Sequence, residues 1–324
     1  KRMSELTGRE ASTIHRLLGA AFSPEGEDTV FSRDEDDPLE CGAVVLDECS
    51  MVDITLMRAL LAALPEGCRL ILVGDADQLP SVGPGRVFSD ILRSGEIPAV
   101  RLTEVFRQAE DSRIVRCAHE INRGEHPEFR KNTGGLFLLN RPEQERASDT
   151  IVELCAERLP KRMGIQPEEI QVLTPTRKGE LGSISLNRRL QAALNPPAKG
   201  KNEKIFGEVA FREGDRVMQI RNNYDIIWHR EQGEGREPEA GSGIYNGDIG
   251  YILGIDAENE TLTVDFDGRM AALSFEQLMQ LEHAWAMTVH KSQGSEYRAV
   301  VLALAQAAPR LLTRGVLYTA VTRA

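Results

Sequence analysis

The chain has 324 residues, of which 41% are hydrophobic and 27% charged, with a formal net charge of −11. This length fits about two domains of ~150 residues, and the ordinary composition excludes collagen-like, low-complexity and wholly disordered chains. No apolar run reaches the ~18–20 residues that cross a bilayer, and no signal-like segment opens the chain, so we expect a cytoplasmic protein without a membrane partner.

Charge and cysteine content narrow the function classes. The net negative charge is unfavourable for a nucleic-acid binder, but residues 171–230 carry 11 basic and 6 acidic side chains. A locally positive groove on an acidic body can bind phosphates because remote charges are screened beyond ~10 Å. A solvated basic face explains the same charges equally well. Five cysteines without a Cys-x-x-Cys pair argue against a disulfide framework and against a zinc site.

The first part of the chain alternates short apolar runs with helical patterns. Residues 43–46 and 69–73 are continuous apolar runs, typical of strands covered on both faces in a parallel sheet. In 54–64 and 111–122 apolar residues recur three and four apart, which predicts helices. The polar, acidic segment 19–42 contains Gly and Pro and predicts a hairpin or loop that projects from the sheet.

The second part repeats this alternation around a different central segment. Its expected strands and helices are 170–173, 183–194, 299–304 and 311–321. Between them, residues 205–282 hold short β-type runs separated by turn residues, which predicts a small antiparallel barrel inserted into an α/β domain. These runs are 217–220, 250–255 and 261–266. Residues 231–243 are predicted to form a mobile loop.

Two adjacent carboxylates, Asp47 and Glu48, follow the first apolar run. They lie at the carboxyl end of a predicted strand, where α/β folds bind ligands. One carboxylate there can hold Mg²⁺, and the next can take a proton from an attacking water. The structural alternative is a strand that leads into a helix N-terminus, with Asp53 near the helix dipole. The pattern favours an NTPase site.

Polar residues also follow the second apolar run and the strand after it. The amide of Gln78 both donates and accepts, so it can report whether a γ-phosphate is present. Arg107 offers a guanidinium suited to bidentate phosphate contact. As isolated residues, both are far more typical of an ordinary polar surface than of a phosphate site.

Five segments, in this order, resemble motifs II to VI of superfamily 1 DNA helicases. They are VVLDECS (44–50), LILVGDADQLP (70–80), LTEVFRQ (102–108), WAMTVHKSQGSEY (285–297) and LYTAVTRA (317–324). The family they resemble most is RecD, the α subunit of exodeoxyribonuclease V and its free-standing relatives. Further similar segments are STIHRLL (12–18), TPTRKG (174–179), GDRVM (214–218) and YNGD (245–248). The resemblance covers nearly the whole chain.

The resemblance implies an α/β fold with two RecA-like domains, 1–140 and 141–324, and ATP bound between them. It implies a Src-homology-3-like barrel at about 205–282 and a strand-separating pin within 19–42. It further implies a helicase of DNA repair and recombination that uses ATP and Mg²⁺ and moves 5′ to 3′ on single-stranded DNA. Forked DNA and RecBC-type subunits are the partners that follow from it.

The resemblance also implies roles for individual residues. Asp47 resembles the Mg²⁺ ligand and Glu48 the general base, while Gln78 is similar to the γ-phosphate sensor. Arg107 and Arg323 resemble two arginines that clamp the transferring phosphoryl group; the alternative for Arg323 is a cation that satisfies helix-end carbonyls. The residues that couple nucleotide to DNA would be Gln293, Gly294 and Glu296. The residues expected near single-stranded DNA are Thr13, His15, Thr174, Asn246, Thr288 and His290.

The chain departs from the family in one respect. ATP binding requires a Gly-x-x-x-x-Gly-Lys-Ser/Thr loop before a helix, and these 324 residues contain none. Gly200-Lys201 is followed by Asn202 and lacks the upstream glycine. We expect a longer helicase trimmed at both ends, and no ATP turnover by these residues alone. Two alternatives stay open: a DNA-binding module that never hydrolysed ATP, and the helicase part of a conjugative relaxase.

Overall fold

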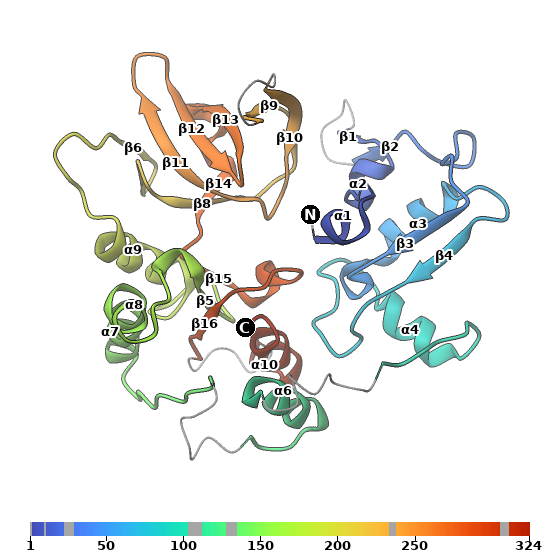
Figure 1. Cartoon of the computed structure of the whole chain (residues 1–324), viewed down its shortest axis with the longest axis horizontal. Coiled ribbons are helices and arrows are strands. Elements are labelled where there is room, and N and C mark those ends of the chain that lie inside the picture. Colours follow the sequence, from blue (N-terminus) through green and yellow to red (C-terminus); the bar gives the residue numbers. More distant parts are fainter. Residues whose placement is uncertain are drawn as a thin grey trace. The chain divides into compact units, whose positions relative to one another are not determined.

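A computed structural model describes residues 2–9, 11–22, 29–102, 112–127, 135–232, 238–304 and 311–324. The chain divides into two compact units, 1–106 and 107–324, which are described one at a time (Figure 1). The helices are α1 (Arg2–Thr7), α2 (Ile14–Leu17), α3 (Ile54–Ala62), α4 (Val87–Ser94), α6 (Arg113–Arg123), α7 (Gln144–Glu153), α8 (Leu159–Met163), α9 (Ser183–Leu194) and α10 (Arg314–Val321). None of these described helices is long and apolar enough to cross a membrane.

The strands of the first unit are β1 (Ala20–Phe22), β2 (Thr29–Phe31), β3 (Ala43–Leu46) and β4 (Arg69–Leu72). The strands of the second unit are β5 (Ile170–Thr174), β6 (Glu203–Phe206), β7 (Val209–Arg212), β8 (Arg216–Gln219), β9 (Asn223–Arg230), β10 (Glu239–Ile244), β11 (Ile249–Asp256), β12 (Thr261–Phe266), β13 (Arg269–Ser274), β14 (Leu281–His283), β15 (Ala286–Thr288) and β16 (Ala299–Leu302).

The first unit is built on the parallel pair β3–β4, with Ala43 opposite Arg69 and Leu46 opposite Leu72. Its core joins this pair to α3 and α4 through buried residues that include Leu46, Leu60 and Phe88. Both predicted strands and the helix from residue 54 are therefore confirmed.

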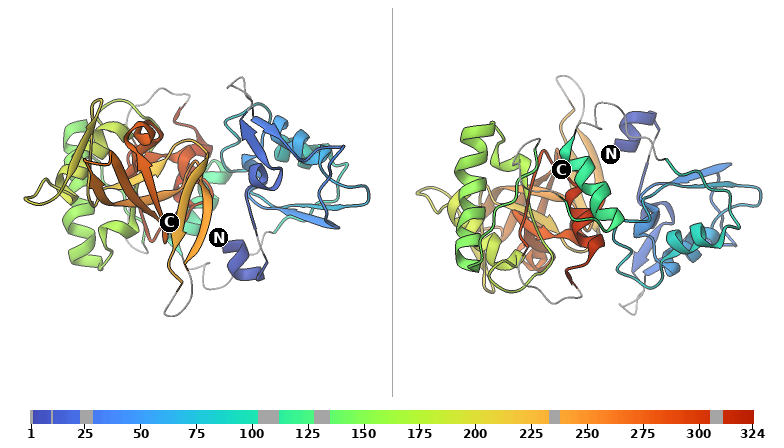
Figure 2. Two further views of the ribbon diagram at one scale, coloured as in Figure 1. Left: turned by 90° about the horizontal axis from the view of Figure 1, so that it is seen from above. Right: turned by 90° about the horizontal axis from the view of Figure 1, so that it is seen from below.

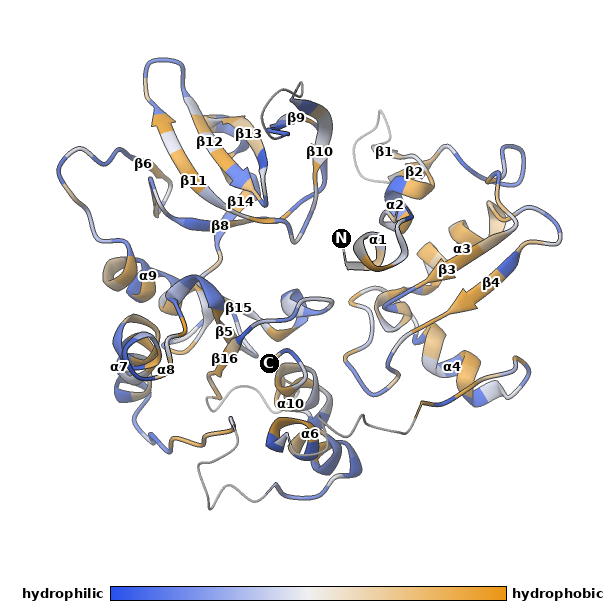
Figure 3. Ribbon diagram, viewed as in Figure 1, coloured by the Kyte–Doolittle hydropathy of each residue, from blue (hydrophilic) through white to orange (hydrophobic). Residues whose placement is uncertain are grey.

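The expectation that β3 and β4 are covered on both faces is wrong for the described residues. Val45 and Ile71 are 52% and 51% exposed, respectively, and Figure 3 shows hydrophobic residues along both strands. The helices of this unit bury the alternate side chains only, because successive side chains of a strand point to opposite faces of the sheet.

The segment expected to project from the first sheet contains a hairpin. Strand β1 pairs antiparallel with β2, from Ala20 opposite Phe31 to Phe22 opposite Thr29. The following residues return to the core without another strand, and the Leu39 amide donates to the Ala63 carbonyl oxygen at 2.8 Å. Of the two forms predicted for this segment, the hairpin is confirmed for its first half.

The second unit contains a three-stranded parallel sheet in the order β15-β5-β16. All five residues of β5 are buried, as expected for a strand covered on both faces. Helices α7, α8 and α9 lie on one side of this sheet, and α6 and α10 lie on the other (Figures 1 and 2). Strand β15 was not predicted, because its three residues are too few to show a period.

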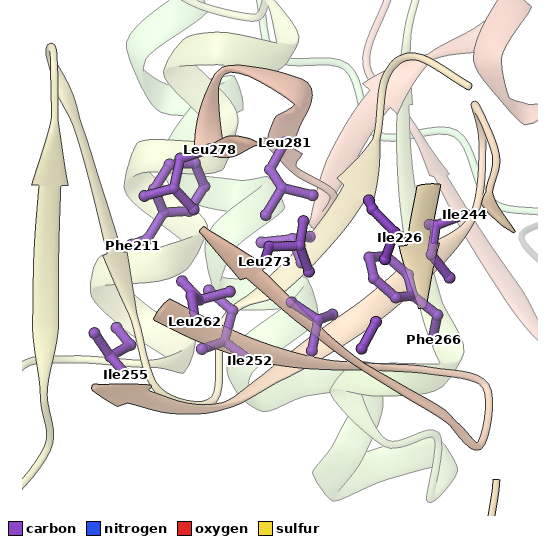
Figure 4. Packing of buried hydrophobic residues seen from close by; sticks show 13 residues of the cluster. Phe211, Ile226, Ile244, Ile252, Ile255, Leu262, Phe266, Leu273, Leu278 and Leu281 are labelled. Atoms are coloured by element: carbon purple, nitrogen blue, oxygen red, sulfur yellow. The ribbon is translucent and has the colours of Figure 1, made fainter. Parts of the chain in front are cut away.

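An antiparallel sheet in the order β10-β9-β13-β12-β11-β8-β14 is inserted between β5 and β15. In β12 the residues alternate between half-buried and buried, and the buried set packs with Phe211, Ile252 and Leu273 in one core (Figure 4). This confirms the predicted antiparallel insertion. Its outer strands differ from the prediction: residues 239–243 belong to β10 rather than to a loop, while 233–237 lie outside the described residues.

The compact units divide after Phe106 rather than at the expected boundary of 140. Helix α6 is the reason, because it packs against α10 within the second unit. The sequence-domain boundary at 140 stays a prediction.

Candidate nucleotide and nucleic-acid sites

Parallel pairing brings the polar residues after β3 and after β4 to the same edge of the first sheet. The Cys49 amide donates to the Val73 carbonyl oxygen at 2.9 Å, and the Val73 amide donates to the Leu46 carbonyl oxygen at 2.8 Å. A Cβ on Gly74 would lie 3.0 Å from the Cys49 nitrogen, so glycine permits this close approach. The loop carrying Asp47 is thereby fixed against the loop that follows β4.

The two carboxylates at this edge differ in environment. Asp47 is exposed, and its Oδ1 accepts a hydrogen bond from the Glu48 amide at 2.9 Å. Glu48 is half-buried and has a left-handed backbone with φ of 53°. Such a conformation costs a non-glycine residue about 1–2 kcal/mol, and strain of this kind gathers at functional sites.

The donors at Asp47 suit a magnesium ion better than a metal whose ligands are all protein side chains. Among the described residues no group of three or more His, Cys, Asp or Glu side chains could hold a metal ion. Magnesium keeps several waters and binds through one or two carboxylates together with substrate phosphates. One exposed carboxylate at the end of a strand fits that mode.

Gln78 is held in the neighbouring loop by Asp75. The Asp75 carboxylate accepts from the Asp77 amide at 2.9 Å and from Gln78 Nε2 at 3.3 Å. Gln78 Oε1 is buried and has no hydrogen-bond partner in the described part of the chain. An unsatisfied buried acceptor costs about 1–3 kcal/mol, so this oxygen is available to accept a hydrogen bond from a water or hydroxyl.

In the second unit Arg323 is buried, with 5% of its surface exposed. Its Nη1 donates to the Ser295 carbonyl oxygen at 3.2 Å and its Nε to the Thr319 carbonyl oxygen at 3.3 Å. The contact with Thr319 corresponds to the helix-end alternative, whereas Ser295 lies in the segment that follows β15. Arg107, the other expected arginine, lies outside the described residues.

The three expected coupling residues surround the segment that Arg323 contacts. Gln293 is buried, Gly294 has φ of 74°, and Glu296 is exposed. The Tyr297 amide donates to the Arg323 carbonyl oxygen at 2.8 Å. The segment after β15 therefore both accepts a hydrogen bond from the Arg323 side chain and donates one to the Arg323 backbone at the end of α10.

Two residues expected near DNA belong to the first unit. Thr13 caps the N-terminus of α2, and its hydroxyl accepts from the Arg16 amide at 3.3 Å. The His15 ring lies 6.0 Å from the Phe31 ring, between centroids. Burial lowers the pKa of His15, and the nearby charge of Asp53 opposes this shift, so at neutral pH His15 offers an uncharged ring.

Three more of these residues lie at the carboxyl edge of the parallel sheet in the second unit. Thr288 is opposite Thr174 in the β15–β5 pair. Thr174 is fully buried, and its hydroxyl donates to the Leu181 carbonyl oxygen at 2.7 Å, so this side chain orders the loop and is not presented at the surface. Thr288 and His290 are half-buried, and burial lowers the pKa of His290.

Charged residues that the sequence reasoning did not single out converge beside Thr288. A small pocket is lined by Arg177, Ser183, Glu282, Thr288 and Lys291 together with four further residues. Glu282 forms ion pairs with Arg177 and with Lys291, the latter at 2.8 Å. Of these three, only Arg177 lies within the positive segment 171–230, so that signal did not point to Glu282 or Lys291.

Asn246, the last expected DNA contact, lies on the inserted sheet in the turn between β10 and β11. It is exposed, and its amide donates to Asn222 Oδ1 at 2.9 Å. The next residue, Gly247, has φ of 97°, which favours glycine. Beside this turn the rings of Tyr224 and Tyr245 meet edge to face with 5.8 Å between centroids.

Three domain families match parts of this chain. Residues 1–135 match the family described as AAA domain, residues 186–266 match the ATP-dependent RecD-like DNA helicase SH3 domain, and residues 283–324 match the UvrD-like helicase C-terminal domain. The ATP-dependent RecD2 DNA helicase of Deinococcus radiodurans is 38% identical over the whole chain. The RecBCD enzyme subunit RecD of Mycobacterium tuberculosis is 32% identical over 97% of it. The chain spans 40% and 52%, respectively, of the length of these relatives.

Two solved structures of Bacteroides Pif1 helicase, one in complex with ADP-AlF3 and ssDNA and one bound to ssDNA, have a TM-score of 0.50 each. Their sequence identities are 17% and 16%, over 96% and 99% of this chain and 76% and 82% of theirs. At this identity the likeness concerns the fold, and the predicted α/β class with RecA-like domains is confirmed. Three domain families match in the order of the motifs and relatives align along the whole chain, so the predicted resemblance to RecD-like helicases is confirmed.

Proposed function

We propose that the protein is an ATP-dependent DNA helicase that moves 5′ to 3′ on single-stranded DNA and separates duplex DNA at forks. The observation that carries this proposal is the edge of the first sheet. There Asp47, Glu48 and the unpartnered amide oxygen of Gln78 follow two paired parallel strands. This set offers a metal ligand, a base and an acceptor for water, which are the groups that hydrolysis of a phosphoanhydride requires.

Each group at this edge has one part in the proposed hydrolysis. Asp47 would hold Mg²⁺, which would neutralise charge on the nucleotide phosphates. Glu48 accepts the proton of the attacking water, and Gln78 Oε1 orients that water. Arg107 and Arg323 stabilise the charge that develops on the phosphoryl oxygens, and Gln293, Gly294 and Glu296 connect that event to DNA.

The second unit supplies the proposed path for DNA. Arg177 and Lys291 offer cations at the pocket that also contains Thr288, and His290 follows in the same segment. Asn246 adds a polar contact from the same unit, and Thr13 and His15 add polar contacts from the first unit, whereas Thr174 acts through the loop it orders. Phosphate contacts of this kind bind strands with little sequence preference and with a steep dependence on salt. A role in repair or recombination, alone or with RecBC-type subunits, is in line with the named relatives.

The test compares the full-length parent protein, which includes a phosphate loop in this proposal, with the 324-residue chain. The parent should hydrolyse ATP in response to single-stranded DNA and unwind substrates with a 5′ tail but not those with a 3′ tail. In the parent, Glu48→Gln should keep Mg·ATP binding and lose about 10²–10⁴ in turnover, because only the base is removed. The exposed Glu66→Gln is the matched control and should keep full turnover.

The outcomes separate the candidates. Substantial turnover by the Glu48→Gln variant would assign the base to another carboxylate. A parent protein that binds DNA but never hydrolyses ATP would favour a non-hydrolysing DNA-binding module. The absence of a phosphate loop from these 324 residues is the observation on its side.

A further inference from the structure

Glu282 divides its carboxylate between two cations that come from separate parts of the second unit. It lies in β14, while Arg177 follows β5 and Lys291 lies in the short 3₁₀ helix Val289–Ser292. One oxygen pairs with Arg177 Nη2 and the other with Lys291 Nζ at 2.8 Å. We call these three side chains the charge trio.

The charge trio is open to solvent. The exposed fractions of the Arg177, Glu282 and Lys291 side chains are 55%, 28% and 28%, respectively. Ion pairs this exposed contribute only about 0–1 kcal/mol to stability. Stability is therefore a weak reason for three segments to converge on one carboxylate at the rim of the pocket beside Thr288.

Control of strand binding is a stronger reason for these three side chains to meet. Without Glu282 the pocket would present two positive charges to a strand, and with it the charge trio has a net charge of +1. A phosphodiester that binds these cations must displace the carboxylate or lie close to it. At about 6 Å, the repulsion between two unit charges corresponds to roughly a 3-fold to 100-fold loss of affinity for an effective dielectric constant of 80 to 20.

We propose that Glu282 competes with the phosphodiester backbone of bound single-stranded nucleic acid for Arg177 and Lys291. It thereby weakens the grip on the strand and speeds its release. The carboxylate also holds both cations in place while the pocket is empty, so that neither must be ordered when a strand arrives. This inference rests on the proposed DNA-binding function and adds a residue that limits affinity for the strand.

The test is Glu282→Gln in the 324-residue chain, titrated with a fluorescein-labelled dT oligonucleotide at several NaCl concentrations. The amide keeps a hydrogen-bond acceptor for one cation and removes the competing charge. We expect tighter binding, roughly 3-fold to 100-fold, with slower dissociation. The slope of log K against log[NaCl] should become more negative by up to about 0.7, the contribution of one added phosphate contact on a single strand.

Two further variants make the result specific. Glu169→Gln removes another carboxylate, paired with Arg298 at 2.8 Å, at the opposite end of β5, and should leave the affinity and the slope unchanged. Lys291→Gln should weaken binding and make the slope shallower. Inorganic tripolyphosphate should bind more weakly than the oligonucleotide to the wild-type chain and to Glu282→Gln, because a short free anion does not span the pocket and the rest of the path.

The outcomes are distinguishable. If no variant and no wild-type chain binds the oligonucleotide, the proposed DNA-binding function fails, and this inference fails with it. If the wild-type chain binds but Glu282→Gln changes neither affinity nor slope while the variant stays folded, the inference alone is overturned. An affinity for tripolyphosphate equal to that for the oligonucleotide would overturn the assignment to a strand, and an equal gain from Glu169→Gln would reduce the effect to net charge.

Discussion

Asp215 joins the inserted sheet to the parallel-sheet domain, and replacing it should destabilise the second unit. The side chain is fully buried. Its Oδ2 accepts from the Arg212 amide at 2.7 Å, from Gln191 Nε2 at 2.6 Å and from His283 Nε2 at 3.0 Å. Its Oδ1 accepts from Asn195 Nδ2 at 2.7 Å. These donors come from α9 and its end, from β7 and from β14, so one carboxylate satisfies groups in both parts.

In Asp215→Asn the shape is kept, but one oxygen becomes an amide nitrogen that faces another donor. At least one hydrogen bond is lost, and the others become neutral. A hydrogen bond to a charged group contributes about 1.5–3 kcal/mol and a neutral one about 0.5–1.5 kcal/mol. We expect the free energy of unfolding of the second unit to fall by about 2–4 kcal/mol.

Urea unfolding followed by tryptophan emission measures this change for the second unit, because the chain has two tryptophans, Trp228 and Trp285, and both lie there. The exposed Asp225→Asn is the control and should shift the free energy by less than about 0.5 kcal/mol. A value for Asp215→Asn that equals this control would refute the claim that the buried carboxylate joins the two parts.

Three other consequences can be measured. A Cβ at Gly83 would lie 2.0 Å from Asp53 Oδ2, so Gly83→Ala should displace Asp53, the N-cap residue of α3. The first unit should lose about 0.5–2 kcal/mol of stability, measured by thermal melts followed by circular dichroism. Gly42→Ala is the control and should lose none, because a Cβ at Gly42 has nothing within 4 Å. Burial lowers the pKa of His290, so the unfolded chain binds a proton at this residue before the folded chain does as pH falls below about 6.5. The stability of the folded chain should therefore decline between pH 7.5 and 5.5. A wild-type urea midpoint that drops no more than that of His290→Gln over this range would contradict the prediction. Burial raises the pKa of Cys155 to about 12, so maleimide should leave this thiol unmodified at pH 7 until urea unfolds the unit, as read by mass spectrometry.

The sequence by itself determined the elements whose side-chain period is long enough to detect. The helix at 183–194 and the strands at 43–46 and 261–266 have the predicted bounds. Five segments in motif order were enough to indicate the family. The reason is that chemistry at strand ends depends on a few residues at fixed spacing, and such spacing is visible in one dimension.

Only the tertiary structure decided which of these side chains are accessible and which residues far apart in the sequence form ion pairs. Thr174 and Arg323 occupy motif positions, yet both are buried. Thr174 donates a hydrogen bond to the Leu181 carbonyl oxygen, and Arg323 donates one to the Ser295 carbonyl oxygen. Glu282 and Arg177 are separated by more than one hundred positions and form an ion pair. Burial and pairing depend on which segments meet in space, and a local pattern of apolar and polar residues does not contain that information.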